Sequence, residues 1–221
     1  KAVTVGNKLE FGAGTELTVT AGNSAVITAK SAVFGANVTI DITGFSGTKY
    51  GEYMTIVSTT DGITGLPVNY NIQGGGSSKN YLTVQIVTRN DNKDLAAMVN
   101  LAWNDVHMQN GIYDLAHGSF DIDQGDPFTV DVVLADRASG SSFNNWDGKS
   151  LVKTGAGVLT LSAANTYSGS TTLTKGVLAL SGAGSIAASS GLKIEDDAVF
   201  NIASITTDKT TLKNLEGRGS I

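Results

Sequence analysis

A short strand pattern recurs along this chain of 221 residues at intervals of about 20 residues. Apolar residues separated by 19 positions match one another: Val158 and Val177, Leu159 and Leu178, Leu161 and Leu180, and Leu173 and Leu192. Shifts of 22 and 21 residues relate two further sets, Leu178 and Leu180 with Phe200 and Ile202, and Leu17 and Val19 with Val38 and Ile40. A period near 20 residues whose exact length varies from one repeat to the next is typical of a chain that coils into stacked turns. A leucine-rich repeat has a similar period, but its Leu-x-x-Leu-x-Leu frame is missing here.

Each repeated stretch reads as a short β-strand, because apolar and small or polar residues alternate and Thr, Val and Ile favour a pleated, half-buried surface. One turn of such a coil cannot bury its own apolar face, so it pairs with the turns about 4.8 Å above and below it. We therefore predict an all-β fold, a parallel β-helix or solenoid. Its inward residues include Leu159, Leu161, Leu178 and Leu180, and we expect Asn165 at a corner and Tyr167 in an aromatic stack.

The composition narrows the class of protein. Charged residues make up 16% of the chain and the net charge is −5. Without a basic run, such a chain is not expected to bind nucleic acid or anionic membranes. No apolar stretch of about 18 residues is present, so we expect no membrane insertion. The absence of cysteine fits a chain that stays free of disulfides in an oxidising compartment. Since the first residue is Lys1 rather than Met, we interpret the sequence as a fragment of a longer protein.

The middle of the chain differs from its ends. We predict β-helix turns at 1–44 and 148–221, separated by a less regular region at 45–147 that holds both Trp, all three Met and both His residues. The region is either a set of irregular turns with long excursions or a small β-subdomain. Residues 74–78, Gly-Gly-Gly-Ser-Ser, indicate a flexible tip. The apolar run at 94–103 is the best candidate for a helix, although it lacks a clear amphipathic period.

The segment 151–180 resembles the passenger-associated strand repeat of bacterial autotransporters. That repeat reads roughly L-x-K-x-G-x-G-x-L-x-L-x-x-x-N-T-Y-x-G-x-T-x-x-x-x-G-x-L. The matching residues here are Leu151, Lys153, Gly155, Gly157, Leu159, Leu161, Asn165, Thr166, Tyr167, Gly169, Thr171, Gly176 and Leu178. For residues 1–145 the sequence offers general β-helix character alone.

The resemblance implies a right-handed β-helix in an AIDA-like, adhesin-type passenger of type V secretion. Such a passenger is exported through the outer membrane by a C-terminal translocator barrel and is displayed on the bacterial cell surface or released. Many relatives are adhesins or self-associating proteins that act in virulence and biofilms. In them the repeat is structural, and folding during export is thought to begin near it. We therefore expect the repeat residues of this chain to carry no activity of their own.

Two groups of residues suggest metal binding, each with a simpler interpretation. Three carboxylates at 121–126, Asp-Ile-Asp-Gln-Gly-Asp, could hold Ca²⁺, but Gln124 stands where the EF-hand frame needs a ligand, and a solvated acidic turn fits better. His107 and His117 could form a zinc site with Asp105 or Asp114. Two histidines ten positions apart are more often surface or partly packed residues, so we expect no metal site and no cofactor.

Catalytic patterns are weak. No serine has a Gly-x-Ser-x-Gly frame. The acids at 195–197, Glu-Asp-Asp, are adjacent, and neighbours on a strand point to opposite faces, whereas glycoside cleavage needs paired carboxylates in a groove. We therefore expect a protein that is not an enzyme.

Aromatic residues are the low-grade candidates for ligand binding: Tyr81, Tyr113 and Trp146, with Trp103 expected in the core because it lies in an apolar run. Two functions stay open. The first is adhesion to a host surface protein or glycan, or to an identical passenger on a neighbouring cell, through extended polar faces. The second is a structural stalk and folding nucleus (an autochaperone segment) that presents an upstream functional tip.

Overall fold

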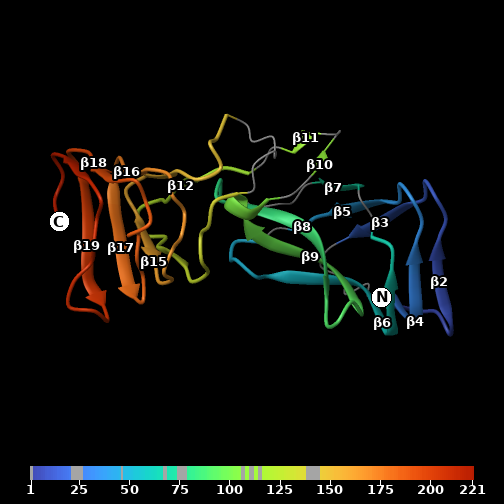
Figure 1. Cartoon of the computed structure of the whole chain (residues 1–221). Coiled ribbons are helices and arrows are strands. Elements are labelled where there is room, and N and C mark those ends of the chain that lie inside the picture. The colour runs from blue at the N-terminus through green and yellow to red at the C-terminus, as the bar shows by residue number, and fades with distance from the viewer. Residues whose placement is uncertain are drawn as a thin grey trace. The chain divides into compact units, whose positions relative to one another are not determined.

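The computed structural model describes residues 2–20, 27–45, 47–66, 69–73, 79–105, 108–109, 112–113, 116–137 and 145–221. Its regular structure is almost entirely β-strand, and in the described residues the helical part is one short 3₁₀ turn, η1 (Ala102–Asn104). None of the described helical segments is long and apolar enough to cross a membrane. The chain forms two compact units, one of residues 1–101 with 105–113 and the other of residues 102–104 with 114–221. Both contain the stacked parallel strands of a β-solenoid (Figure 1).

The C-terminal unit consists of two parallel sheets. The strands of the first are β12 (Ser119–Asp121), β14 (Leu151–Thr154), β16 (Thr171–Leu173), β18 (Leu192–Ile194) and β20 (Leu215–Gly217). Those of the second are β13 (Phe128–Val130), β15 (Val158–Leu161), β17 (Gly176–Gly182) and β19 (Ala198–Ile205). The chain visits the two sheets alternately, so each turn adds one strand to both. The predicted solenoid is confirmed.

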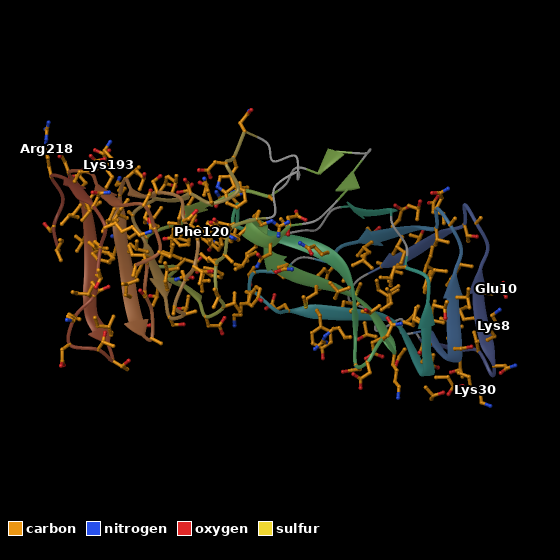
Figure 2. All side chains as sticks on the ribbon, in the orientation of Figure 1. Lys8, Glu10, Lys30, Phe120, Lys193 and Arg218 are labelled. Carbon is orange, nitrogen blue, oxygen red and sulfur yellow. The ribbon has the colours of Figure 1, made fainter. Side chains whose placement is uncertain are left out.

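The register between β15 and β17 confirms the shift of 19 residues. Leu159 pairs with Leu178 and Leu161 with Leu180, and Leu178 in turn pairs with Phe200 at the shift of 22. These side chains point inward and are buried, as is Phe120 on β12, whereas Lys193 and Arg218 project from the ribbon (Figure 2). Burial of a leucine side chain contributes about 1.5–3 kcal/mol, so this apolar ladder is the main stabilising feature of the unit.

Two of the predicted pairs are displaced by two residues. Leu173 pairs with Ile194 rather than with Leu192, and Leu17 pairs with Ile40 rather than with Val38. A slip by an even number of residues keeps every side chain on its original face of the sheet. The alternation of apolar residues therefore predicted the inward face correctly, while the lengths of the corners decided the partner.

The N-terminal unit combines parallel and antiparallel strands. In one sheet β1 (Val3–Thr4) and β2 (Lys8–Phe11) pair with β4 (Ile27–Phe34), and β4 pairs with β6 (Tyr53–Thr64). A second parallel sheet joins β3 (Glu16–Thr20), β5 (Thr39–Thr43) and β7 (Asn69–Gln73). The long strand β6 also pairs antiparallel with β9 (Asp94–Leu101), which forms a hairpin with β8 (Leu82–Arg89). A two-stranded antiparallel ladder, β10 (Met108–Gln109) with β11 (Ile112–Tyr113), is also part of this unit.

The apolar run at 94–103 is strand β9 followed by η1, not a helix. Its hairpin turn contains Asn90, Asp91 and Asn92 with φ between 52° and 64°, a region that Asn and Asp tolerate better than most residues. The region 45–147 thus contains antiparallel strands, whereas the turns of a simple solenoid pair in parallel. The division between the compact units falls inside this region, and parallel pairing with the repeat begins within it, at β12 and β13. Residues 74–78 lie outside the described part of the chain.

Candidate functional site

The glycines of the repeat lie where two turns approach most closely. A Cβ atom at Gly155 would lie 2.3 Å from the carbonyl oxygen of Ile122, and one at Gly176 would lie 2.5 Å from that of Gly157. Both glycines also have φ near +70°, which disfavours other residues. At Gly157 and Gly169 a Cβ would come within 2.4 Å of backbone oxygens. The glycines of the motif therefore permit close stacking of the corners.

Asn165 joins three consecutive turns. Its Oδ1 accepts a hydrogen bond from the backbone N–H of Leu134 at 2.9 Å. Its Nδ2 donates to the carbonyl oxygens of Ala163 at 2.9 Å and Ser185 at 3.1 Å. The side chain is buried, where an unmade hydrogen bond would be costly. The prediction of a corner residue is confirmed, and the structure adds that its amide links neighbouring corners.

Tyr167 belongs to an aromatic cluster inside the same unit, with Trp103 at its centre. Its ring lies 5.4 Å from that of Trp103, which packs edge to face on Trp146 at 4.8 Å. Burial raises the pKa of the Tyr167 hydroxyl, which shares a 2.7 Å hydrogen bond with Oγ1 of Thr171. Trp103 is fully buried, and its Nε1 donates to the carbonyl oxygen of Ala135. Trp103 lies in the core as expected, whereas Tyr167 makes a tilted contact with Trp103, at 56° between the ring planes, rather than the expected stack.

Lys153 of the motif also faces the interior, and its ammonium group donates hydrogen bonds to three backbone carbonyls. Beside it, Leu159, Leu161 and Leu178 are fully buried. Apart from Thr166, which is exposed, the matched repeat residues therefore serve packing or hydrogen bonding inside the solenoid.

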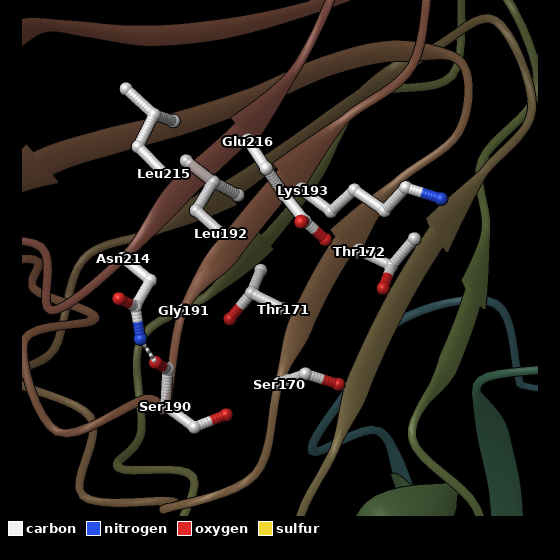
Figure 3. Close-up of a pocket in the computed structure, with 10 residues that line it drawn as sticks. All are labelled: Ser170, Thr171, Thr172, Ser190, Gly191, Leu192, Lys193, Asn214, Leu215 and Glu216. Carbon is white, nitrogen blue, oxygen red and sulfur yellow. Dashed lines mark hydrogen bonds between the residues drawn. The ribbon is translucent and has the colours of Figure 1, made fainter.

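A polar groove of about 490 Å³ lies on the outside of the C-terminal unit, where β16, β18 and β20 begin (Figure 3). Its lining comes from equivalent positions of successive turns: Ser170, Thr171, Thr172, Ser190, Gly191, Leu192, Lys193, Asn214, Leu215 and Glu216. Across the ladder, Thr172 pairs with Lys193 and Lys193 with Glu216. Nδ2 of Asn214 donates to the carbonyl oxygen of Ser190 at 2.8 Å. The groove therefore offers hydroxyl and amide groups with one charge of each sign.

Comparison with protein families gives one match. The model of the passenger-associated-transport-repeat matches residues 151–180, the segment whose glycines, asparagine and tyrosine are described above. No curated protein matches the chain.

The chain fits an autotransporter passenger domain. The passenger family implies an exported, surface-displayed protein.

The two aromatic candidates whose side chains the structure describes do not form an open binding surface. Tyr81 is 2% exposed, so its ring is covered by the core of the N-terminal unit. The Trp146 ring is half-buried against Trp103, and its Nε1 donates to the carbonyl oxygen of Ser150 at 2.8 Å. The side chain of Tyr113 lies outside the described residues. Trp146 thus holds the chain that enters the repeat.

The metal candidates are spread over the surface or belong to internal contacts. In the described part of the passenger, no three His, Asp or Glu side chains are grouped closely enough to hold a metal ion. Asp121 accepts a hydrogen bond from Oγ1 of Thr154, and His117 Nδ1 accepts one from the N–H of Ser119. Asp105 is buried and accepts from Nε2 of Gln85. His107 and Asp114 lie outside the described residues, so the zinc hypothesis stays untested.

Two of the three acids at 195–197 form surface ion pairs. Glu195 lies 2.7 Å from Nζ of Lys193, and Asp196 lies 3.8 Å from a guanidinium nitrogen of Arg218. Exposed pairs of this kind contribute little to stability, at most about 1 kcal/mol. They give the outer face of the last two turns a pattern of alternating charge, whereas the preceding turn presents hydroxyl groups there.

One pair of hydrogen bonds beside the repeat, between Asp136 and Ser168, was not predicted from the sequence. The carboxylate of Asp136 accepts two 2.6 Å hydrogen bonds, from the backbone N–H and from Oγ of Ser168, and these bonds lower the pKa of Asp136. An Asp 32 positions before a Ser carries no local signal, because the contact depends on how the intervening turn is closed. The Asn165 motif was the nearest available clue, since its partner Leu134 precedes Asp136 by two residues.

Proposed function

We propose that this passenger acts in adhesion, by binding a host surface protein or glycan, or an identical passenger on a neighbouring cell, through the polar outer faces of its solenoid. One observation carries the proposal: the repeat residues other than Thr166 serve packing and hydrogen bonding inside the solenoid, while hydroxyl, amide and charged groups line the outside groove at 170–172, 190–193 and 214–216. A surface of this composition favours binding over catalysis, and we propose neither an enzymatic activity nor a cofactor. In the full-length protein a C-terminal translocator barrel would be the partner for export.

A structural stalk is the second candidate function. The observation that favours it is the same inward arrangement, because Asn165, Lys153 and the glycines all stabilise the stacking of turns. A segment with such dense internal contacts suits a folding nucleus that presents a functional region elsewhere in the protein. The two candidates differ in what they require of the outer groove, which a stalk does not need.

Two matched serine variants distinguish the candidates. Ser190 lies exposed in the groove, and Ser204 lies exposed on β19 of the other sheet. No side-chain hydrogen bond of either serine is observed, so arginine should fit at both positions without disturbing the core. In cells that display the full-length passenger, we expect Ser190→Arg to reduce adhesion or clumping several-fold at equal surface display, and Ser204→Arg to leave it unchanged. Parent-like adhesion in both variants would favour the stalk.

A further inference from the structure

Lys153 occupies a position that a lysine rarely takes. Among the lysines in the described part of the chain it is the buried one, with 0% of its residue surface exposed. It lies on the inward face of β14, two residues after Leu151, and pairs with Leu173 of the next turn. Burying an ammonium group without partners is strongly unfavourable. The environment of its Nζ atom must therefore replace the water that it loses.

Three backbone carbonyls provide that environment. Nζ donates to the carbonyl oxygens of Thr154 at 2.5 Å, Gly155 at 2.8 Å and Lys175 at 3.2 Å. An ammonium group has three N–H donors, so these three bonds use its full capacity. Thr154 is the last residue of β14 and Gly155 follows it, whereas Lys175 follows β16 in the next turn. The side chain thus connects the same corner of two successive turns.

The glycines of the repeat help to shape this site. The acceptor residues Thr154 and Lys175 each precede a glycine with positive φ, Gly155 at 71° and Gly176 at 72°. Since φ of a residue sets the orientation of the preceding peptide group, both carbonyls are turned in the same manner. The carboxylate of Asp121, on the adjacent strand β12, attracts the charge. Without the ammonium group, these corner carbonyls would lose a donor in a region with little access to water.

We propose that the three carbonyls of Thr154, Gly155 and Lys175 form an acceptor site for the N–H donors of a primary amine, and that Lys153 fills it to clasp two turns together. The site is a property of the backbone, so it persists when the side chain is shortened. Removal of the lysine beyond Cβ deletes three carbons and the nitrogen, which together equal n-propylammonium. That ion should therefore occupy the vacated site in a Lys153→Ala variant.

The test uses the whole chain of 221 residues and measures hydrogen exchange in peptides that cover residues 151–180. We expect Lys153→Met, which keeps the volume but not the donors, to exchange about tenfold faster than the parent, because buried carbonyls are left bare. The matched control is Lys193→Met, at an exposed lysine of the same unit, which should exchange like the parent. In Lys153→Ala, millimolar n-propylammonium should slow exchange, whereas n-propanol, of similar size but uncharged, should not.

Two results would overturn the proposal. The first is parent-like exchange in Lys153→Met, which would mean that the carbonyls need no donor. The second is equal protection of Lys153→Ala by n-propylammonium and n-propanol, which would mean that the vacated space selects for size and not for N–H donors. If Lys153→Ala does not fold, the comparison of Lys153→Met with Lys193→Met alone decides the role of the clasp.

Discussion

At the scale of single residues, the inward face of β14 has Lys153 where the neighbouring strands β12 and β16 have Phe120 and Leu173. The signal for its burial is present in the sequence, because the alternation of β14 places Lys153 on the same face as Leu151. The three carbonyl acceptors could not be foreseen, since they depend on the backbone conformation at Gly155 and Gly176. Asn165 was recognisable as a corner residue, but its partners Leu134 and Ser185 lie in other turns.

Burial lowers the pKa of Lys153 to about 8 from its usual 10.5, and the Asp121 carboxylate acts in the opposite direction. Between these two values the folded chain has released a proton that the unfolded chain keeps, so this group favours folding more as the pH rises. We expect the free energy of unfolding of the parent, relative to that of Lys153→Met, to increase between about pH 8 and pH 10.5. Urea titrations of both proteins at matched pH values measure this difference in the free energy of unfolding. A difference that stays flat or falls would mean that the carbonyl bonds outweigh desolvation.

At the scale of strands, the sequence was sufficient to predict which side chains face inward. It was insufficient to predict some of the residues that pair across neighbouring strands. The shift of 19 residues gave the pairs of β15 and β17 correctly, because both strands and the connection between them are regular. Leu173 and Leu17 were each assigned a partner two residues away from the observed one. Alternation fixes a face but not the length of an irregular corner. The antiparallel strand β9 was missed for a related reason, since a buried apolar run can be either helix or strand.

Adjacent residues of β15 provide a test of the inward and outward faces. Leu161 is fully buried, whereas Thr160 points outward and is half-buried. Leu161→Asp would place an unpaired charge in the apolar ladder at a cost of several kcal/mol. We expect it to abolish protease resistance across residues 151–221, and we expect Thr160→Asp to retain it. Limited proteolysis followed by mass spectrometry checks both variants, and a protected Leu161→Asp protein would show that β15 has the opposite orientation.

At the scale of the whole molecule, the repetition builds a solenoid, and the matched repeat fits a passenger that is exported and displayed. The proposed binding surface was much less predictable. Tyr81 and Trp146 were chosen as aromatic residues, yet the first is buried and the second packs on Trp103. The groove at 170–172, 190–193 and 214–216 has no such signal, because its Ser, Thr and Asn residues are common in any corner and come together only by stacking.

The proposed adhesion depends on many weak contacts made by many copies. Short polar side chains on an outer face form individually weak interactions, and these gain strength when copies act together on one surface. The net charge of −5 should not prevent side-by-side approach at physiological salt, where charges are screened beyond about 8 Å. A single chain in solution should therefore bind a host cell or another copy weakly, while a dense layer of chains should bind firmly.

The most direct test coats beads with the chain at graded densities and counts the beads retained by host cells or by one another. Adhesion through extended polar faces predicts that retention rises more steeply than in proportion to density, and that Ser190→Arg beads are retained several-fold less than Ser204→Arg beads at every density. Retention that stays at the level of uncoated beads across all densities, or that is equal for the two variants, would contradict the account.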